Sequence, residues 1–197
     1  IGETVLFFKD LYPQAKIVAF EPSPRSFNLL KKNVAQNHLK NVKLIKAAVG
    51  KVEGHFNFYV DKNPDQPWGR GDSLKQNKFS GPDHAKVIRV PVVKLSKYIK
   101  SDVDLLKLDV EGAETEVIEE MDHKLEKLRF IILEYHASVH NRQNRLDRIL
   151  QALNKHDFKI KIYLSRWLIP NFMIYIIALL MTVMRVEEYW LRIYAKK

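Results

Sequence analysis

Two carboxylates and a glycine stand together in the middle of the chain, where Asp109, Glu111 and Gly112 fall within four residues. A carboxylate can accept a proton from a hydroxyl group, bind that group by hydrogen bonds, or hold a cation. His136, further along the chain, adds an imidazole that changes charge near neutral pH. These residue types suit acid–base chemistry on a hydroxyl group, so we take Asp109, Glu111 and His136 as candidate catalytic residues.

A strand and a helix are expected to position the two carboxylates. The apolar run Leu105–Val110 is typical of a short strand that is covered on both faces. Ala113–Met121 favours a helix, and Glu114 lies in its first turn, where its charge complements the helix dipole. In an open α/β sheet, ligands bind beyond the carboxyl ends of the strands. The acidic stretch therefore lies where a site would form, although a solvated acidic turn would read the same way.

A second strand, predicted over Phe130–Tyr135, ends just before His136. The imidazole would then emerge at the same sheet edge as Asp109 and could serve as a base, unless it is an ordinary hydrogen-bonded loop histidine. The oxygens of Asp109, Glu111 and Glu134 could instead hold Mg²⁺. No tight acidic cluster is visible in the sequence, so no metal is expected.

A further carboxylate, Glu21, ends the predicted strand Lys16–Phe20 near the start of the chain. Pro24 suits the first turn of a following helix, with Ser23 as its cap. Glu21 lies nineteen positions after Gly2. In nucleotide-binding α/β folds, an acid about 20 residues beyond the glycine turn binds ribose hydroxyls. The two carboxylate oxygens can accept from both hydroxyls of a ribose diol.

Four stretches carry a family resemblance: 21–24 with Phe27, Leu30 and Asn33; 47–50 with Gly54; 106–114; and 132–134. Together they resemble the FkbM-type methyltransferase domain, from Ile1 to about Phe158. The resemblance implies an α/β protein with the Rossmann-like class I methyltransferase fold. Such a fold has a doubly wound, mostly parallel sheet with an antiparallel last strand.

The start of the chain departs from this family pattern. Ile1–Thr4 is similar to the tail of the family's glycine-rich loop, and the chain has no initiator Met. We therefore expect a single methyltransferase domain over 1–197 that lacks its first strand and most of the glycine-rich loop, although a natural short start is the alternative.

The resemblance also implies a cofactor, S-adenosyl-L-methionine, and four residues that would bind it. Glu21 would bind the ribose, Gly2 would allow close approach near the methionine part, and Ala48 would line the adenine pocket. Asp109 would lie where the methionine end meets the methyl acceptor. In the long stretch 61–84, Ser73 and His84 are weaker candidates for contact with the acceptor.

The implied activity is O-methylation of a hydroxyl on a sugar, glycolipid or secondary metabolite, so the partner would be a small-molecule, glycan or lipid-linked acceptor. A nicotinamide-dependent Rossmann oxidoreductase is the alternative among enzymes, since an acid after the second strand suits any adenosine ribose. A non-catalytic, membrane-docked binding module is the alternative outside enzymes.

The composition narrows these choices. The chain has 197 residues, no cysteine and a formal net charge of +10. This length suits one domain, and the lack of cysteine excludes disulfides and thiolate chemistry and agrees with a cytoplasmic location. The positive charge attracts anionic partners, but the lysines are scattered over polar faces, so we do not expect nucleic acid as a partner.

A nearly continuous apolar stretch, Trp167–Met184, forms a predicted hydrophobic insert at 165–186 between the last two strands. Those strands are predicted over Phe158–Leu164 and Tyr189–Lys196. If they pair in one sheet, both ends of the insert lie on one side of a membrane, which excludes a single crossing. We expect peripheral contact with the inner face of the membrane, with a homo-oligomer interface, a lid over the substrate or a buried helix as alternatives.

Overall fold

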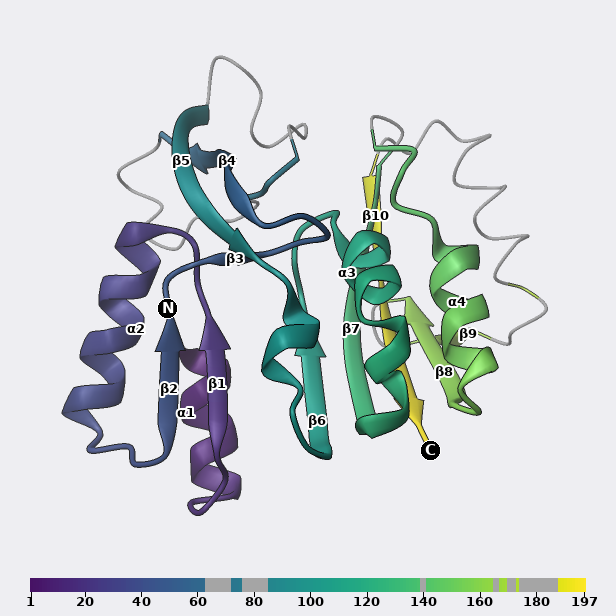
Figure 1. The fold of residues 1–197 in the computed structure, drawn as a ribbon, viewed down its shortest axis with the longest axis horizontal. Coiled ribbons are helices and arrows are strands. Elements are labelled where there is room, and N and C mark those ends of the chain that lie inside the picture. Colours follow the sequence, from purple (N-terminus) through teal and green to yellow (C-terminus); the bar gives the residue numbers. More distant parts are fainter. Residues whose placement is uncertain (63–71, 76–84, 139–140, 165–166, 170–172, 174–187) are drawn as a thin grey trace. The chain divides into compact units, whose positions relative to one another are not determined.

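The computed structural model describes residues 1–62, 72–75, 85–138, 141–164, 167–169, 173 and 188–197 (Figure 1). His84, most of the long stretch 61–84 and most of the apolar insert lie outside these residues. The chain divides into two compact units, Ile1–Val93 and Lys94–Lys197.

The first unit begins with α1 (Glu3–Leu11), β1 (Ile17–Phe20), α2 (Pro24–Gln36) and β2 (Val42–Ile45). Strands β1 and β2 pair in parallel, with Ile17 opposite Val42, as a helix connection between them requires. Pro24 occupies the first turn of α2 and Ser23 its N-cap position, although the Ser23 side chain makes no capping hydrogen bond. The predicted strand–acid–helix element around Glu21 is therefore confirmed.

A three-stranded sheet completes the first unit, formed by β3 (Ala48–Val49), β4 (Gly54–Asp61) and β5 (Ala85–Val93) in the order β3-β5-β4. Residues 42–49 do not form one continuous strand, because β2 ends at Ile45, β3 begins at Ala48, and the two strands join different sheets.

Pro91 lies in β5, the middle strand of this sheet, although proline within a sheet is usually confined to edge strands. Proline is tolerated there because β3 pairs only with Val92 and Val93. At Pro91, β5 pairs with β4 alone, because β3 does not extend that far. The N–H that proline lacks is therefore not needed for a hydrogen bond to β3.

The second unit contains β6 (Val103–Leu108), α3 (Glu114–Glu120), β7 (Leu128–Ser138), α4 (Leu146–Lys155), β8 (Lys159–Leu164), β9 (Trp167–Ile169) and β10 (Glu188–Lys196), with short 3₁₀ helices at Leu95–Tyr98 and Asp122–Lys127. The strand order is β6-β7-β10-β8-β9. β6 and β7 are parallel, whereas β10 is antiparallel to both of its neighbours. The antiparallel last strand is thus confirmed, whereas a single doubly wound sheet stays a prediction.

Helices α3 and α4 contact each other and pack on β7 and β8 respectively, on one face of this sheet (Figure 1). Side chains along β7 alternate, so that Ile131, Leu133 and Tyr135 are buried while the residues between them are more exposed. Fully buried apolar side chains of this kind each stabilise the fold by about 1.5–3 kcal/mol. The helices thus fix the position of the strand that carries His136.

The end of β8 and the start of β10 lie at the same end of the sheet, because the two strands pair in antiparallel, with Tyr163 opposite Arg192. The sequence argument against a single membrane crossing requires that β8 and β10 pair in one sheet, and they do. The first three residues of the apolar stretch form β9, which pairs with the end of β8. No helix in the described part of the chain is long and apolar enough to cross a membrane. Membrane contact through 167–184 stays a prediction.

Candidate active site

Asp109 directly follows the last residue of β6, Leu108, at the predicted carboxyl end of the strand. Its Oδ2 accepts a hydrogen bond from Nζ of Lys107 at 3.0 Å. The same Nζ lies 3.5 Å from Oε1 of Glu134 on β7. Lys107 therefore neutralises part of the negative charge at this edge of the sheet. It also forms an ion pair with Glu134, the third Mg²⁺ ligand considered from the sequence.

Glu111 lies in a tight turn between β6 and α3, in the left-handed backbone region at φ 50°, followed by Gly112 at φ 99°. A residue other than glycine pays roughly 1–3 kcal/mol for such strain, which is typical of functional turns. Both polar groups of Gly112 are held by side chains: its N–H donates to Oε1 of Glu114 at 3.0 Å, and its carbonyl accepts from Nδ2 of Asn141 at 2.7 Å. These bonds hold the turn in the shape that presents Glu111.

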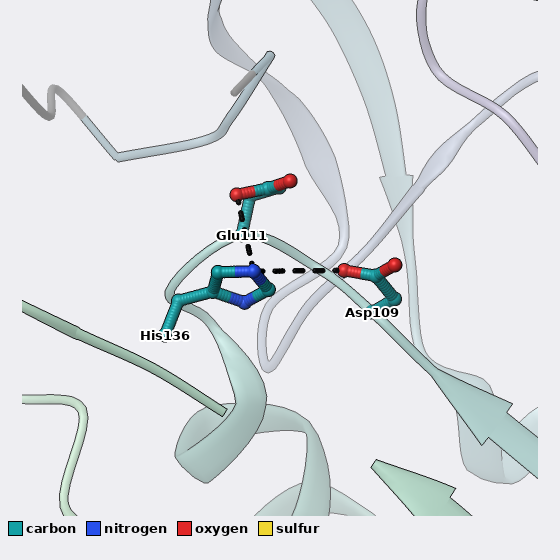
Figure 2. Close-up of side chains that lie close together, drawn as sticks. All are labelled: Asp109, Glu111 and His136. Carbon is teal, nitrogen blue, oxygen red and sulfur yellow. Dashed lines mark ion pairs between the residues drawn. The ribbon is translucent and has the colours of Figure 1, made fainter. Parts of the chain in front are cut away.

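His136 lies inside β7, which continues to Ser138. The prediction that the strand ends at Tyr135 is therefore wrong, because β10 pairs with β7 as far as Ser138 and extends it. The imidazole nevertheless reaches the predicted place. Its Nε2 lies 3.5 Å from Oε2 of Glu111 and 3.9 Å from Oδ1 of Asp109, so both carboxylates face the same nitrogen (Figure 2).

Glu114 completes the site on the Nδ1 side of His136. The sequence predicted only that its charge complements the helix dipole in the first turn of α3. Its side chain is fully buried, at 0% exposure. Oε1 lies 3.0 Å from Nδ1 of His136, and Oε2 accepts a hydrogen bond from Nδ2 of Asn144. The position of Glu114 in the acidic motif was the one available signal, whereas nothing in the sequence pointed to Asn141 or Asn144.

Asn144 connects this carboxylate to the surrounding elements. Its Nδ2 also donates to the carbonyl of His136 at 2.9 Å, and its Oδ1 accepts from both the N–H and the hydroxyl of Thr115. The hydroxyl of Tyr135 donates to the Asn144 carbonyl at 2.7 Å. Among the described residues, no buried side-chain polar atom lacks a hydrogen-bond partner. A fully satisfied network of this kind rigidifies its members.

The surroundings shift the pKa values of Glu111 and His136 in a way that suits proton transfer. Burial raises the pKa of Glu111 to about 7, against the attraction of His136 and with help from the charges of the neighbouring carboxylates. Burial alone would lower the pKa of His136, but the hydrogen bond to Glu114 and the surrounding carboxylate charges outweigh it and raise this pKa to about 9. Near pH 8, His136 is therefore an imidazolium and most Glu111 is ionised.

One ligand atom from each of Asp109, Glu111 and His136 lies within 4.8 Å of the others, so the three could hold a metal ion. The structure therefore places His136, rather than Glu134, beside Asp109 and Glu111 as the third candidate metal ligand. Lys107 already brings a positive charge to 3.0 Å from Asp109, which offsets part of the negative charge that would attract a metal ion to this group.

The first unit contains the other predicted cofactor residues. Oε1 of Glu21 accepts the Ser23 N–H at 2.9 Å, and the Glu21 side chain is 23% exposed. Burial raises the pKa of Glu21, and the bond from Ser23 partly offsets this rise. Gly2 has φ 99°, and a Cβ there would lie 2.7 Å from Cδ1 of Leu30, so this position strongly favours glycine.

Two other candidates lie in the core of the first unit. Ala48 packs in a cluster with Phe58, Val90 and Val92, so its methyl group has a structural role and its place in an adenine pocket stays a prediction. Ser73 is 1% exposed, its backbone pairs with Tyr59, and its Oγ accepts the Lys75 N–H. This burial argues against the predicted contact between the Ser73 hydroxyl and an acceptor.

Comparison with known protein families shows that residues 1–160 match the Methyltransferase FkbM domain. The chain is 30% identical over 137 residues to Methyltransferase 1 of Beauveria bassiana (strain ARSEF 2860), covering 62% of this chain and 55% of that protein. It is 30% identical over 164 residues to Methyltransferase sdnD of Sordaria araneosa, covering 68% and 62% respectively. It is 29% identical over 146 residues to 2-O-methyltransferase NoeI of Sinorhizobium fredii (strain NBRC 101917 / NGR234), covering 68% and 59%. The chain therefore spans 55 to 62% of the length of these relatives.

Solved structures agree at the level of the fold. Methyltransferase FkbM from Methylobacillus flagellatus KT superposes with a TM-score of 0.53 at 13% identity, covering 98% of this chain and 40% of that one. The StiE O-MT structure, residues 942–1257, superposes with a TM-score of 0.50 at 8% identity, covering 100% and 64%. At such low identity these likenesses establish an α/β fold of the methyltransferase type.

Proposed function

Because the chain belongs to the Methyltransferase FkbM domain family, whose cofactor is S-adenosylmethionine, we propose that the protein methylates a hydroxyl group of a sugar, glycolipid or secondary metabolite. The observation that carries the oxygen acceptor is the pairing of Glu111 with His136, which supplies a carboxylate base beside a cation. The name of one relative, 2-O-methyltransferase NoeI, supports an oxygen acceptor. Family membership argues against the nicotinamide-dependent alternative.

A base is needed because an alcohol is a poor nucleophile near neutral pH. When bound, S-adenosylmethionine would supply an activated methyl group on a sulfonium: the acceptor oxygen would bond to the methyl carbon, and the thioether would leave with the S–C bonding electrons. Glu111 takes the hydroxyl proton onto a carboxylate oxygen as the new O–C bond forms. A base whose pKa lies near the working pH does this best, and the pKa of Glu111 is about 7.

His136 acts beside this base rather than as the base itself. With a pKa of about 9, its imidazole already holds a proton at neutral pH and cannot accept another. Its Nε2–H faces Glu111 and Asp109, so it lowers the pKa of Glu111 against the effect of burial and stabilises negative charge that develops on the acceptor oxygen. Asp109 supports the imidazolium from the second side.

The residues proposed for the cofactor fit it in chemical terms. One oxygen of Glu21 accepts the Ser23 N–H. The carboxylate keeps further lone pairs that can accept hydrogen bonds from a ribose diol. The backbone at Gly2 requires glycine and caps α1, which agrees with close approach of a ligand. We propose Gly2, Glu21, Ala48 and Asp109 as cofactor-binding residues on this basis.

The test combines binding with turnover. Titration calorimetry of the purified protein should show binding of S-adenosylhomocysteine and none of NAD⁺. Incubation with methyl-labelled S-adenosylmethionine and a panel of glycosides, glycolipids and hydroxylated metabolites should transfer label to oxygen. Binding of NAD⁺ in place of S-adenosylhomocysteine, or transfer only to nitrogen or carbon acceptors, would refute the proposal.

A further inference from the structure

We propose that Glu114 is a positioning residue that holds the imidazole of His136 and the turn bearing Glu111 in register through one shared oxygen atom. Oε1 of Glu114 accepts from the Gly112 N–H at 3.0 Å and lies 3.0 Å from Nδ1 of His136. These two partners come from different elements, the turn after β6 and strand β7. The catalytic consequence rests on the proposed function, whereas the effect on the imidazole does not.

The burial of Glu114 calls for an explanation beyond packing. A carboxylate at 0% exposure has lost its hydration, and an apolar side chain of similar size is often as stable or more stable at such a place. Here three donors replace the lost water: Gly112 N–H, His136 Nδ1–H and Asn144 Nδ2. One of these donors is the imidazole of His136 itself, and another, the Gly112 N–H, belongs to the turn that presents Glu111.

The contact at Nδ1 decides which way the imidazole faces. With Nδ1–H donating to Glu114, Nε2 is left toward Glu111 and Asp109, at 3.5 and 3.9 Å. A ring flipped by 180° would remove this nitrogen from both carboxylates and break the bond to Glu114. The second ring nitrogen of a histidine commonly sets the orientation of the first in this way.

The contact at Gly112 acts on Glu111 through the backbone. Glu111 adopts φ 50°, a conformation that costs energy and persists only where the surroundings enforce it. Glu114 holds the Gly112 N–H from the buried side, and Asn141 holds the Gly112 carbonyl at 2.7 Å. The turn is thus held at the peptide groups on both sides of the Gly112 Cα.

Glu114→Gln tests the arrangement, because it keeps the shape of the side chain and removes its charge. Glu116→Gln, in the same turn of α3, is the matched control. The imidazole signal of His136, assigned from its loss in His136→Gln, is followed by NMR from pH 5 to pH 10. We expect the imidazole pKa to fall by at least one pH unit in Glu114→Gln. With an acceptor in hand, kcat should fall about 10–100-fold while KM for S-adenosylmethionine stays within about twofold.

Asn141→Ala tests the turn alone and does not alter a fully buried group, so it remains informative if Glu114→Gln does not fold. Its control is Gln143→Ala in the same loop. We expect kcat to fall roughly threefold to tenfold with an unchanged imidazole titration, because the Asn141 side-chain amide donates to the Gly112 carbonyl in the turn rather than to His136 or Glu114.

Three outcomes decide between the explanations. A folded Glu114→Gln protein with the wild-type imidazole titration would overturn the proposal. Unchanged kcat in Asn141→Ala would overturn its extension to the turn. A lowered imidazole pKa in Glu114→Gln, in a protein whose wild type transfers no methyl group, would support the positioning contact and reject the proposed function.

Discussion

Nε2 of His136 lies 3.5 Å from Oε2 of Glu111, although the two residues belong to different elements of the second unit. Each group changes the proton affinity of the other. The imidazolium lowers the pKa of the carboxyl group against the effect of burial, and the carboxylate raises the pKa of the imidazole. Removal of either charge should therefore shift the pKa of the other group.

Replacing the proposed base should stop turnover without preventing cofactor binding. In Glu111→Gln we expect kcat to fall about 10²–10⁴-fold, the usual contribution of a general base, while the dissociation constant for S-adenosylhomocysteine changes less than twofold. Rapid-quench methyl transfer and calorimetry measure the two quantities. Glu126→Gln, an exposed substitution in the same unit, is the control. A Glu111→Gln enzyme with near wild-type kcat would assign the base elsewhere.

The rate should depend on pH in a bell shape. Activity should rise as Glu111 loses its proton near pH 7 and fall as His136 loses its proton near pH 9. A kcat/KM profile from pH 5 to pH 10 measures both limbs. His136→Gln should lose the alkaline limb and keep a shifted acid limb. A profile in wild type that is flat between pH 6 and pH 10 would contradict both assignments.

Stability should decrease as the pH rises through the same range. The folded-state pKa of His136 is raised from 6.5 to about 9, so its contribution is complete below pH 6.5 and is lost as the pH approaches 9. Glu111 acts in the same direction between pH 4.5 and about 7, because the folded state binds its proton more tightly. Urea unfolding should show a loss of roughly 1–3 kcal/mol between pH 6.5 and pH 9. His136→Gln should show a clearly smaller loss, and an equal loss would refute the assignment.

Removing the carboxylate of Glu21 should weaken cofactor binding. A charge-assisted hydrogen bond contributes about 1.5–3 kcal/mol, so Glu21→Ala should raise the dissociation constant for S-adenosylhomocysteine about 10–150-fold by calorimetry. Asp10→Ala, on the exposed side of α1, is the control. Unchanged affinity in a folded Glu21→Ala protein would rule out a ribose contact.

Asp109→Asn should affect turnover far more than folding. Asp109 is 36% exposed and its ion pair with Lys107 is partly solvated, so the free energy of unfolding should change by less than about 1 kcal/mol. The loss of the charge beside Nε2 of His136 should lower kcat at least tenfold. Asp104→Asn, at an exposed carboxylate within β6, serves as the control. A strongly destabilised variant whose folded fraction retains full activity would make Asp109 a structural residue.

Local sequence was sufficient for most of the elements. The strand and helix that flank Glu21, and the strand β8, follow from hydrophobic periodicity and capping residues. It also placed Asp109 and Glu111 just beyond the carboxyl end of a strand. These features depend on residues within about one helical turn or one strand of each other, which a single sequence displays directly.

Long-range pairing decided the rest. Only the partner strand β10 shows that β7 continues past His136, and only the short length of β3 explains why Pro91 is tolerated in a middle strand. Glu114 was visible as an acid in a first helical turn. Its complete burial, and its bonds to Gly112, His136 and Asn144, depend on a strand and a loop that lie 22 and 30 residues away in the sequence. The charge states of Glu111 and His136 follow from that assembly, because burial and neighbouring charges, rather than residue type, set their pKa values.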